Sequence, residues 1–201
     1  TLEHSLERFG LGCDDITDVI LTHLHFDHAG GATRRENNTL VPTFPKAQYY
    51  VQQYHYSWAQ SPTEKDRASF MSENFEPLVA EGMLELIDGE GELFPGVGVR
   101  LAFGHTRALQ MVTVRSQGKT LLAAADLFPT HAHIKVPYVM GYDNFPVTAM
   151  EEKRDILPII AREEWLVCFG HDAFMQAAYI GESEKGYEIK EKVCITSYPG
   201  E

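Results

Sequence analysis

The sequence predicts a layered α/β fold in which a sheet carries metal-ligand residues at the ends of its strands. Segments with strand patterning and segments with helix patterning mix along the 201 residues, with no repeat, low-complexity tract or linker between them. Four of the predicted strands are each followed by histidine or aspartate. The mixture argues against a helical bundle and an all-β sandwich, and the length indicates one domain, residues 1–201.

In the first half of the chain, apolar spacing and turn residues place the elements. Helices are expected at Leu2–Phe9, which Gly10 ends, and from Ser61 to about Ala80; strands are expected at Ile16–Thr22, Ala47–Val51 and Leu84–Ile87. Ser61-Pro62-Thr63-Glu64 has the pattern of a helix start, with serine as cap, proline first and glutamate third. Gly31–Pro45 is rich in turn residues and is predicted to be a loop.

In the second half, β-rich runs dominate. Strands are expected at Val97–Phe103, at Gln110–Arg115 and Thr120–Ala125 around the turn Gln117-Gly118, at Trp165–Phe169 and at Ile189–Ser197. Trp165–Phe169 is continuously apolar, as in a central strand. Thr148 with Glu151 opens a helix that runs to about Glu164 and bends near Pro158.

The composition excludes several classes of protein. A net charge of −12 opposes a nucleic-acid partner, because a phosphate backbone demands a basic face. Cys13, Cys168 and Cys194 form no disulfide framework, which favours the reducing cytoplasm. No run approaches the ~18 apolar residues of a membrane span, and no signal peptide is visible. The chain starts at Thr1 rather than methionine, which leaves secretion open.

The most informative stretch is His23-Leu24-His25-Phe26-Asp27-His28, between an apolar strand and Gly30-Gly31. In an extended segment His23 and His25 point the same way, so one metal ion can take both. Asp27 and His28 follow where the chain can turn, and they can reach a second ion. Imidazole and carboxylate are the ligands expected for zinc and its first-row neighbours. The alternative reading is a solvated, histidine-rich loop.

Three further residues of the same kinds follow strands later in the chain. They are His105 after 97–103, Asp126 after 120–125 and His171 after 165–169. Taken alone, each of these residues is more typical of a turn or of a satisfied surface position. Side chains from several strand ends converge when the strands share a sheet, so the recurrence predicts one shared metal site.

As a set, HxHxDH, Gly104-His105-Thr106, Asp126 and His171 resemble the metallo-β-lactamase superfamily, whose fold is an αββα sandwich. The resemblance implies two divalent metal ions, zinc or alternatively cobalt, manganese or iron. The implied ligands are His23, His25 and His105 for one ion and Asp27, His28 and His171 for the other, with Asp126 bridging. Ala125 and Arg107-Ala108 depart from the family's usual glycine and Pro-Gly, but neither departure removes a ligand.

The beginning of the chain departs further from the family. Superfamily members usually start with a strand-rich segment that carries an Asp-Thr-Gly-like turn, and only about twenty residues precede His23. The resemblance therefore implies that the N-terminal strands of the sandwich are missing from this chain, or that another chain supplies them.

The later segments look like one branch of the superfamily. Asp126–Ile134, Tyr138–Asp143 and Glu151–Arg154 are similar to quorum-quenching N-acyl homoserine lactonases of the YtnP type, which are related to the methyl-parathion hydrolase group. The function expected is a dinuclear-metal hydrolase that opens a lactone, such as an acyl homoserine lactone, or a related ester by attack of a metal-bridging hydroxide. Asp27 and Asp126 take the catalytic roles. The tyrosine that well-studied lactonases carry after the bridging aspartate is replaced by Phe128-Pro129.

The substrate pocket is predicted from aromatic and imidazole side chains beside the ligands and on a lid segment. The candidates are Phe26, Trp58, Phe128 and His133, each with ordinary packing or a structural hydrogen bond as the alternative. His4 and His55 are expected to be solvated, and Asp172 to support the site rather than to ligate.

Other functions stay open on the same residues. A phosphotriesterase, a glyoxalase II-like thioesterase or a β-lactamase would use the same scaffold. A di-iron oxidoreductase is less favoured, because those sites usually carry glutamate where this chain has His25. An inactive binding module is disfavoured by the intact ligand set. The partner expected is a small-molecule ester or lactone, and analogy with related lactonases suggests a homodimer.

Overall fold

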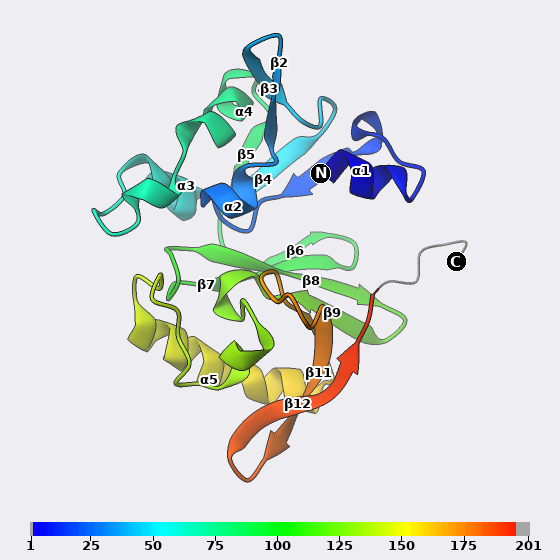
Figure 1. Ribbon diagram of the computed structural model, residues 1–201, viewed down its shortest axis with the longest axis vertical. Helices are drawn as coiled ribbons and strands as arrows, with labels where there is room; N and C mark the ends of the chain where they lie inside the picture. Colours follow the sequence, from blue (N-terminus) through cyan, green and yellow to red (C-terminus); the bar gives the residue numbers. More distant parts are fainter. Residues whose placement is uncertain (1, 196–201) are drawn as a thin grey trace. The chain divides into compact units, whose positions relative to one another are not determined.

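Two separate hydrophobic cores organise the part of the chain that the structure describes, residues 2–195. In the computed structural model, drawn in Figure 1, these residues form one unit within 2–88 and a second within 89–195. Each core belongs to one unit. The predicted mixture of strands and helices is confirmed. The single domain over residues 1–201 stays a prediction. Among the described residues, no helix combines the length and the apolar character that crossing a membrane requires.

The first unit is built on a parallel three-stranded sheet in the order β1-β4-β5. The strands are β1 (Asp18–Ile20), β4 (Gln48–Gln52) and β5 (Leu84–Ile87), and the helices are α1 (Leu2–Glu7), α2 (Phe26–Ala29), α3 (Gln53–Gln60) and α4 (Glu76–Ala80). Tyr49 and Val51 alternate along β4 and are fully buried in the core of the unit. The Tyr49 hydroxyl accepts the Phe44 amide at 3.0 Å and donates to the Ala32 carbonyl at 3.2 Å, so it ties β4 to the preceding loop.

The predicted helix from Ser61 to Ala80 is wrong over most of its length. Helix α3 lies earlier and ends at Gln60, with Ser61 as its C-terminal cap, so Pro62 marks a stop rather than a start. The Thr63 hydroxyl and the Trp58 indole N–H each donate to the buried carboxylate of Asp66 at 2.8 Å. These bonds hold a loop with short 3-10 turns at Arg67–Ser69 and Ser72–Asn74, and only α4 is helical as predicted.

The predicted loop Gly31–Pro45 is also wrong, because it contains an antiparallel hairpin of β2 (Thr33–Glu36) and β3 (Thr39–Pro42). Its turn is Asn37-Asn38, with φ of 48° and 66°. Asparagine tolerates this left-handed conformation better than other non-glycine residues, and two such residues match the twist of a hairpin. The Asn-Asn pair was the sequence signal for this hairpin.

Asn38→Val is expected to destabilise the protein by about 1 kcal/mol, because a β-branched residue is strained at positive φ. Urea unfolding monitored by circular dichroism measures the change. Asn38→Gly is the matched control and is expected to leave the stability equal or slightly higher. Equal stabilities of the valine and glycine variants would contradict the role given to the turn.

The second unit is built on a seven-stranded sheet in the order β12-β11-β10-β9-β8-β7-β6. The strands are β6 (Gly91–Phe94), β7 (Val97–Ala102), β8 (Leu109–Ser116), β9 (Lys119–Ala123), β10 (Leu166–Cys168), β11 (Ala177–Ser183) and β12 (Gly186–Val193). The predicted hairpin β8–β9 and the interior strand β10 are confirmed, whereas β6 and β11 were not predicted. The predicted last strand extends to Ser197, whose position lies outside the described residues.

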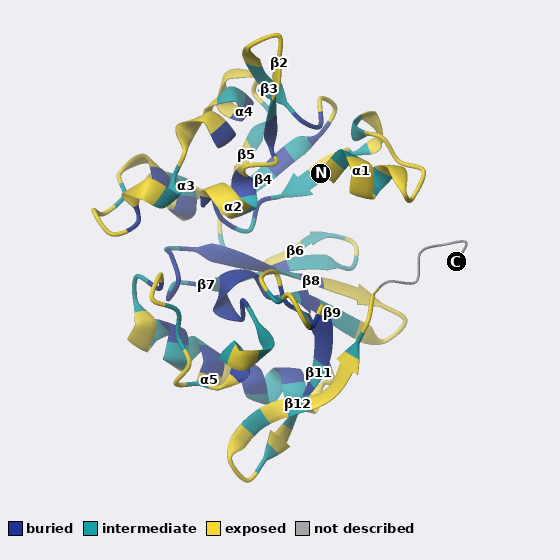
Figure 2. Cartoon of the chain, viewed as in Figure 1, coloured by how far each residue is buried: buried dark blue, intermediate teal, exposed yellow. Residues whose placement is uncertain are grey.

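Strands β7, β9 and β10 run in the same direction. Both β7 and β9 pair antiparallel with β8, and β10 pairs parallel with β9 after the crossover helix α5 (Pro146–Arg162). In Figure 2 the buried side of α5 faces this sheet, and Ile156, Leu157 and Ile160 pack in the core of the unit. The predicted helix is confirmed, including Pro158 within it. The carboxyl ends of three strands therefore lie at one edge of the sheet.

Candidate metal-ligand groups

The first unit brings together four of the predicted ligands, which we call the N-terminal ligand group: His23, His25, Asp27 and His28. The chain leaves β1 at Ile20, and His25 then caps the single turn of α2, which carries Asp27 and His28. The His23 ring centroid lies 4.6 Å from that of His25 and 4.1 Å from that of His28. The turn expected after His25 is present, and the three imidazoles are neighbours.

Two contacts fix the backbone of this group and the ring of His23. The Leu24 amide donates to His55 Nε2 at 2.8 Å, and the Thr22 hydroxyl hydrogen-bonds His23 Nδ1 at 3.2 Å. The expectation of a solvated His55 is wrong, because this side chain is fully buried. Since Nε2 of His55 accepts, its ring proton sits on Nδ1. His55 thus supports this group. It is an isolated histidine in the sequence, and no motif around it predicted this role.

The burial and donor types of this group fit a divalent cation. His23 and His25 are 0 % and 5 % exposed, whereas Asp27 is exposed. The Asp27 carboxylate lies 3.5 Å from His28 Nε2. Buried imidazoles beside a carboxylate form the nitrogen and oxygen donor set that zinc prefers.

The second unit brings together the other three predicted ligands, which we call the C-terminal ligand group: His105, Asp126 and His171. They follow β7, β9 and β10, so they lie at the same edge of the sheet. His105 Nε2 is 3.3 Å from one Asp126 oxygen, and His171 Nε2 is 3.2 Å from the other. Asp126 thus presents one oxygen to each imidazole, the arrangement that a bridging carboxylate needs.

Asp143 orients the His105 ring and was not identified as a site residue from the sequence. The His105 Nδ1–H donates to Asp143 Oδ1 at 3.0 Å, and the Met140 amide donates to Asp143 Oδ2 at 2.9 Å. The carboxylate is buried. A carboxylate on the outer nitrogen fixes the tautomer of a metal-binding histidine and leaves Nε2 as the ligand atom. Asp143 therefore supports the fit of this group to a metal ion.

Asp172 links the loops that carry Asp126 and His171. It accepts the backbone amides of His131, Phe174 and Met175 and forms an ion pair with the His131 ring. Burial raises the pKa of Asp172, but these hydrogen bonds outweigh it and lower the pKa to about 2. The His171 amide also donates to the Pro129 carbonyl at 2.9 Å. Asp172 thus fixes the loop next to His171, and its support of a metal site stays a prediction.

The four predicted pocket residues have different surroundings. Phe26 is 48 % exposed, whereas Phe128 is fully buried in the core of its unit. The Trp58 indole is held by Asp66, as described above. His133 Nδ1 hydrogen-bonds the Thr130 hydroxyl at 2.8 Å, and its pKa is lowered by burial and by the charge of Lys153. Their contact with a substrate stays a prediction for all four.

Comparisons of the sequence and of the structure with known proteins both find metal-dependent hydrolases or lactonases. A sequence profile described as the Metallo-beta-lactamase superfamily matches residues 1–171. An N-acyl homoserine lactonase of Bacillus cereus is 27 % identical over 187 residues, which cover 92 % of this chain and 64 % of that protein. A probable metal-dependent hydrolase from Staphylococcus aureus superimposes with a TM-score of 0.85 at 27 % identity, covering 97 % of this chain and 68 % of the other.

A third relative carries a ligand. An N-acyl homoserine lactone hydrolase, solved with the product N-hexanoyl-L-homoserine at its catalytic metal centre, superimposes with a TM-score of 0.65 at 26 % identity. The match covers 85 % of this chain and 62 % of that structure. This chain thus spans less than two thirds of the length of these two lactonases.

Proposed function

Since this chain belongs to the metallo-β-lactamase superfamily, we propose that it is a metal-dependent hydrolase that opens lactones of the N-acyl homoserine type or related esters. The relatives support the substrate class, because a curated lactonase and a lactonase with product at its metal centre both match most of the chain. The observation that carries the proposal is the donor set of the two ligand groups, in particular Asp126 with one oxygen toward each of His105 and His171.

On this proposal the seven residues of the two groups would bind two divalent cations. The proposed assignment is His23, His25 and His105 for one ion and Asp27, His28 and His171 for the other, with Asp126 shared. Zinc fits these donors best, and cobalt, manganese and iron share them. Such ions would polarise an ester carbonyl and lower the pKa of water from ~15.7 toward ~7.

The residues of the chain supply orientation and proton transfer. Asp126 would hold both ions in place, and the exposed carboxylate of Asp27 would move a proton to or from the reacting ester. Burial lowers the pKa of His133, which favours its neutral form, and this imidazole would hydrogen-bond the leaving oxygen. Phe26 offers an apolar wall for the acyl chain. The buried Phe128 supplies no phenol, so no tyrosine assists the carbonyl at that position.

The experiment combines metal analysis with a substrate panel. Elemental analysis by inductively coupled plasma mass spectrometry is expected to find two divalent ions per chain in the purified protein. The protein is expected to hydrolyse an acyl homoserine lactone faster than a phosphotriester or a glutathione thioester. His23→Ala is expected to lose metal and activity, with His4→Ala, an exposed histidine, as the control. Absence of lactone hydrolysis after reconstitution with zinc, cobalt, manganese and iron would overturn the proposal.

A further inference from the structure

The turn that carries His105 lies directly against the first half of α5. A Cβ added at Gly104 would stand 2.4 Å from Cα of Ala149, which is closer than any real contact. Only glycine allows this approach of turn and helix backbone. The position of His105 is therefore defined by α5 and not by its own strand alone.

The residues that lead into α5 bind the carbonyl groups of this turn. The Phe145 amide donates to the Gly104 carbonyl at 2.8 Å. The backbone and side-chain amides of Asn144 each donate to the His105 carbonyl at 3.0 Å. The carbonyl side of the turn is thus satisfied by the two residues just ahead of the helix.

Glu152 binds the amide side of the same turn. One carboxylate oxygen accepts the Phe103 amide at 2.5 Å, and the other accepts the Gly104 amide at 3.1 Å. Hydrogen bonds to an ionised acceptor are about twice as strong as neutral ones. Glu152 is partly buried on α5, and this burial raises the pKa of its carboxyl group, while the hydrogen bonds from the Phe103 and Gly104 amides oppose the rise.

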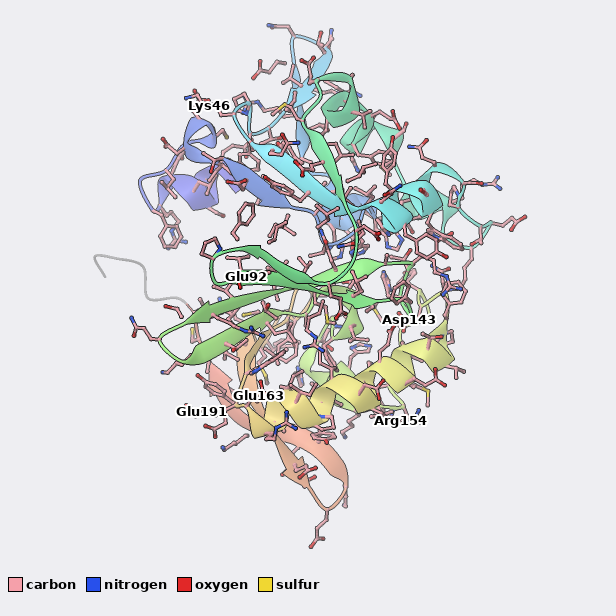
Figure 3. All side chains as sticks on the ribbon, turned by 180° about the vertical axis from the view of Figure 1, so that it is seen from behind. Lys46, Glu92, Asp143, Arg154, Glu163 and Glu191 are labelled. Carbon is pink, nitrogen blue, oxygen red and sulfur yellow. The ribbon has the colours of Figure 1, made fainter. Side chains whose placement is uncertain are left out.

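Glu152 and Asp143 act on different parts of His105. Asp143 fixes the ring through Nδ1, whereas Glu152 fixes the backbone that leads to the residue. Figure 3 marks Asp143 just ahead of α5, the helix that carries Glu152. Both come from the 143–152 segment, which lies 38 to 47 residues after the ligand that they support.

We propose that Glu152 is a positioning residue for the metal ligand His105, and that its carboxylate sets the affinity with which the C-terminal ligand group holds a divalent cation. The inference rests on the proposed function only in taking His105 as a metal ligand. It assigns Glu152 no contact with substrate.

The test measures zinc affinity rather than turnover. Apo protein is titrated with zinc in competition with a chromogenic chelator, for the wild type, Glu152→Ala and Glu152→Gln. Glu152→Ala is expected to bind one of the two ions about 10–100-fold more weakly, as other outer partners of metal ligands do. Glu152→Gln keeps the volume and one acceptor, so its loss is expected to be smaller. Glu151→Gln, an exposed neighbour on α5, is the control and is expected to match the wild type.

The outcomes separate positioning from plain stability. A fall in thermal stability with unchanged affinity for both ions, in Glu152→Ala or in the isosteric Glu152→Gln, would overturn the inference. If Glu152→Ala does not fold, the affinity of Glu152→Gln decides. A wild type that binds two ions but hydrolyses no lactone would refute the proposed function and leave this inference standing. A wild type that binds no zinc would refute both.

Discussion

Asp126→Asn is expected to lower kcat/KM for the lactone by a factor on the order of 10³ or more. The two oxygens of Asp126 lie 3.3 and 3.2 Å from the Nε2 atoms of His105 and His171, so the carboxylate can bridge two ions. Asparagine keeps the volume but removes the charge and replaces one acceptor with a donor. Both ions are expected to be held less tightly, since both share this ligand.

Kinetics and metal stoichiometry on the same preparation check this result. Asp155→Asn, which changes an exposed carboxylate on α5, is the control and is expected to keep wild-type activity and both ions. A variant Asp126→Asn that retains two ions and near-wild-type activity would show that Asp126 is not the shared ligand.

Lys153→Met is expected to be more stable than the wild type at pH 7 by about 1 kcal/mol, because the ~3 kcal/mol cost of the buried charge exceeds the value of the lost hydrogen bond to the Tyr138 carbonyl. Lys153 is 1 % exposed, and its ammonium donates to the Tyr138 carbonyl at 2.7 Å. Burial lowers its pKa from 10.5 to about 8, although the nearby charge of Asp143 opposes the shift. The charged amine is therefore a cost to the fold, and methionine fills a similar volume without the charge.

The pH dependence has a defined sign. Below pH 8 the lysine is charged in both states, and the cost of burying the charge is complete. Between pH 8 and about 10.5 the unfolded chain binds more protons than the native state, so the free energy of unfolding of the wild type rises with pH. The advantage of Lys153→Met is expected to disappear across this window.

Urea unfolding at several pH values between 7 and 11 measures both effects. Arg154→Met is the matched control, because Arg154 lies on the exposed side of α5 (Figure 3). It is expected to follow the wild type at every pH. Parallel pH curves for the wild type and Lys153→Met would contradict the assignment of a buried charge.

Local sequence patterns correctly predicted those elements of the fold that depend mainly on residues close together in the sequence. The turn Gln117-Gly118 joins β8 and β9 as expected, because both residues adopt positive φ, and the apolar run at Trp165 became an interior strand. The helix predicted to start at Ser61 is wrong, because Thr63 and Trp58 donate hydrogen bonds to Asp66 and these bonds stabilise a loop instead. The sequence spacing also placed the predicted ligands of each unit close together.

The supporting residues were not predictable from spacing. His55 bonds a backbone amide 31 positions away, and Asp143 bonds a ring 38 positions away. Glu152 reaches across 49 positions to the Phe103 amide. Tertiary packing determines which residues become such partners. The local sequence around a single glutamate or histidine does not distinguish it from a solvated one.

The long connection between the parallel strands β9 and β10 has a consequence for the conformational entropy of the chain. The two-residue turn between β8 and β9 closes a very short loop, whereas β10 reaches β9 only after the whole crossover through α5. Loop-closure entropy grows with length, so the neighbours Asp126 and His171 are brought together by one of the costlier closures of the sheet. An ion held by both residues would offset part of that cost, and its binding free energy would then count as folding free energy for the second unit.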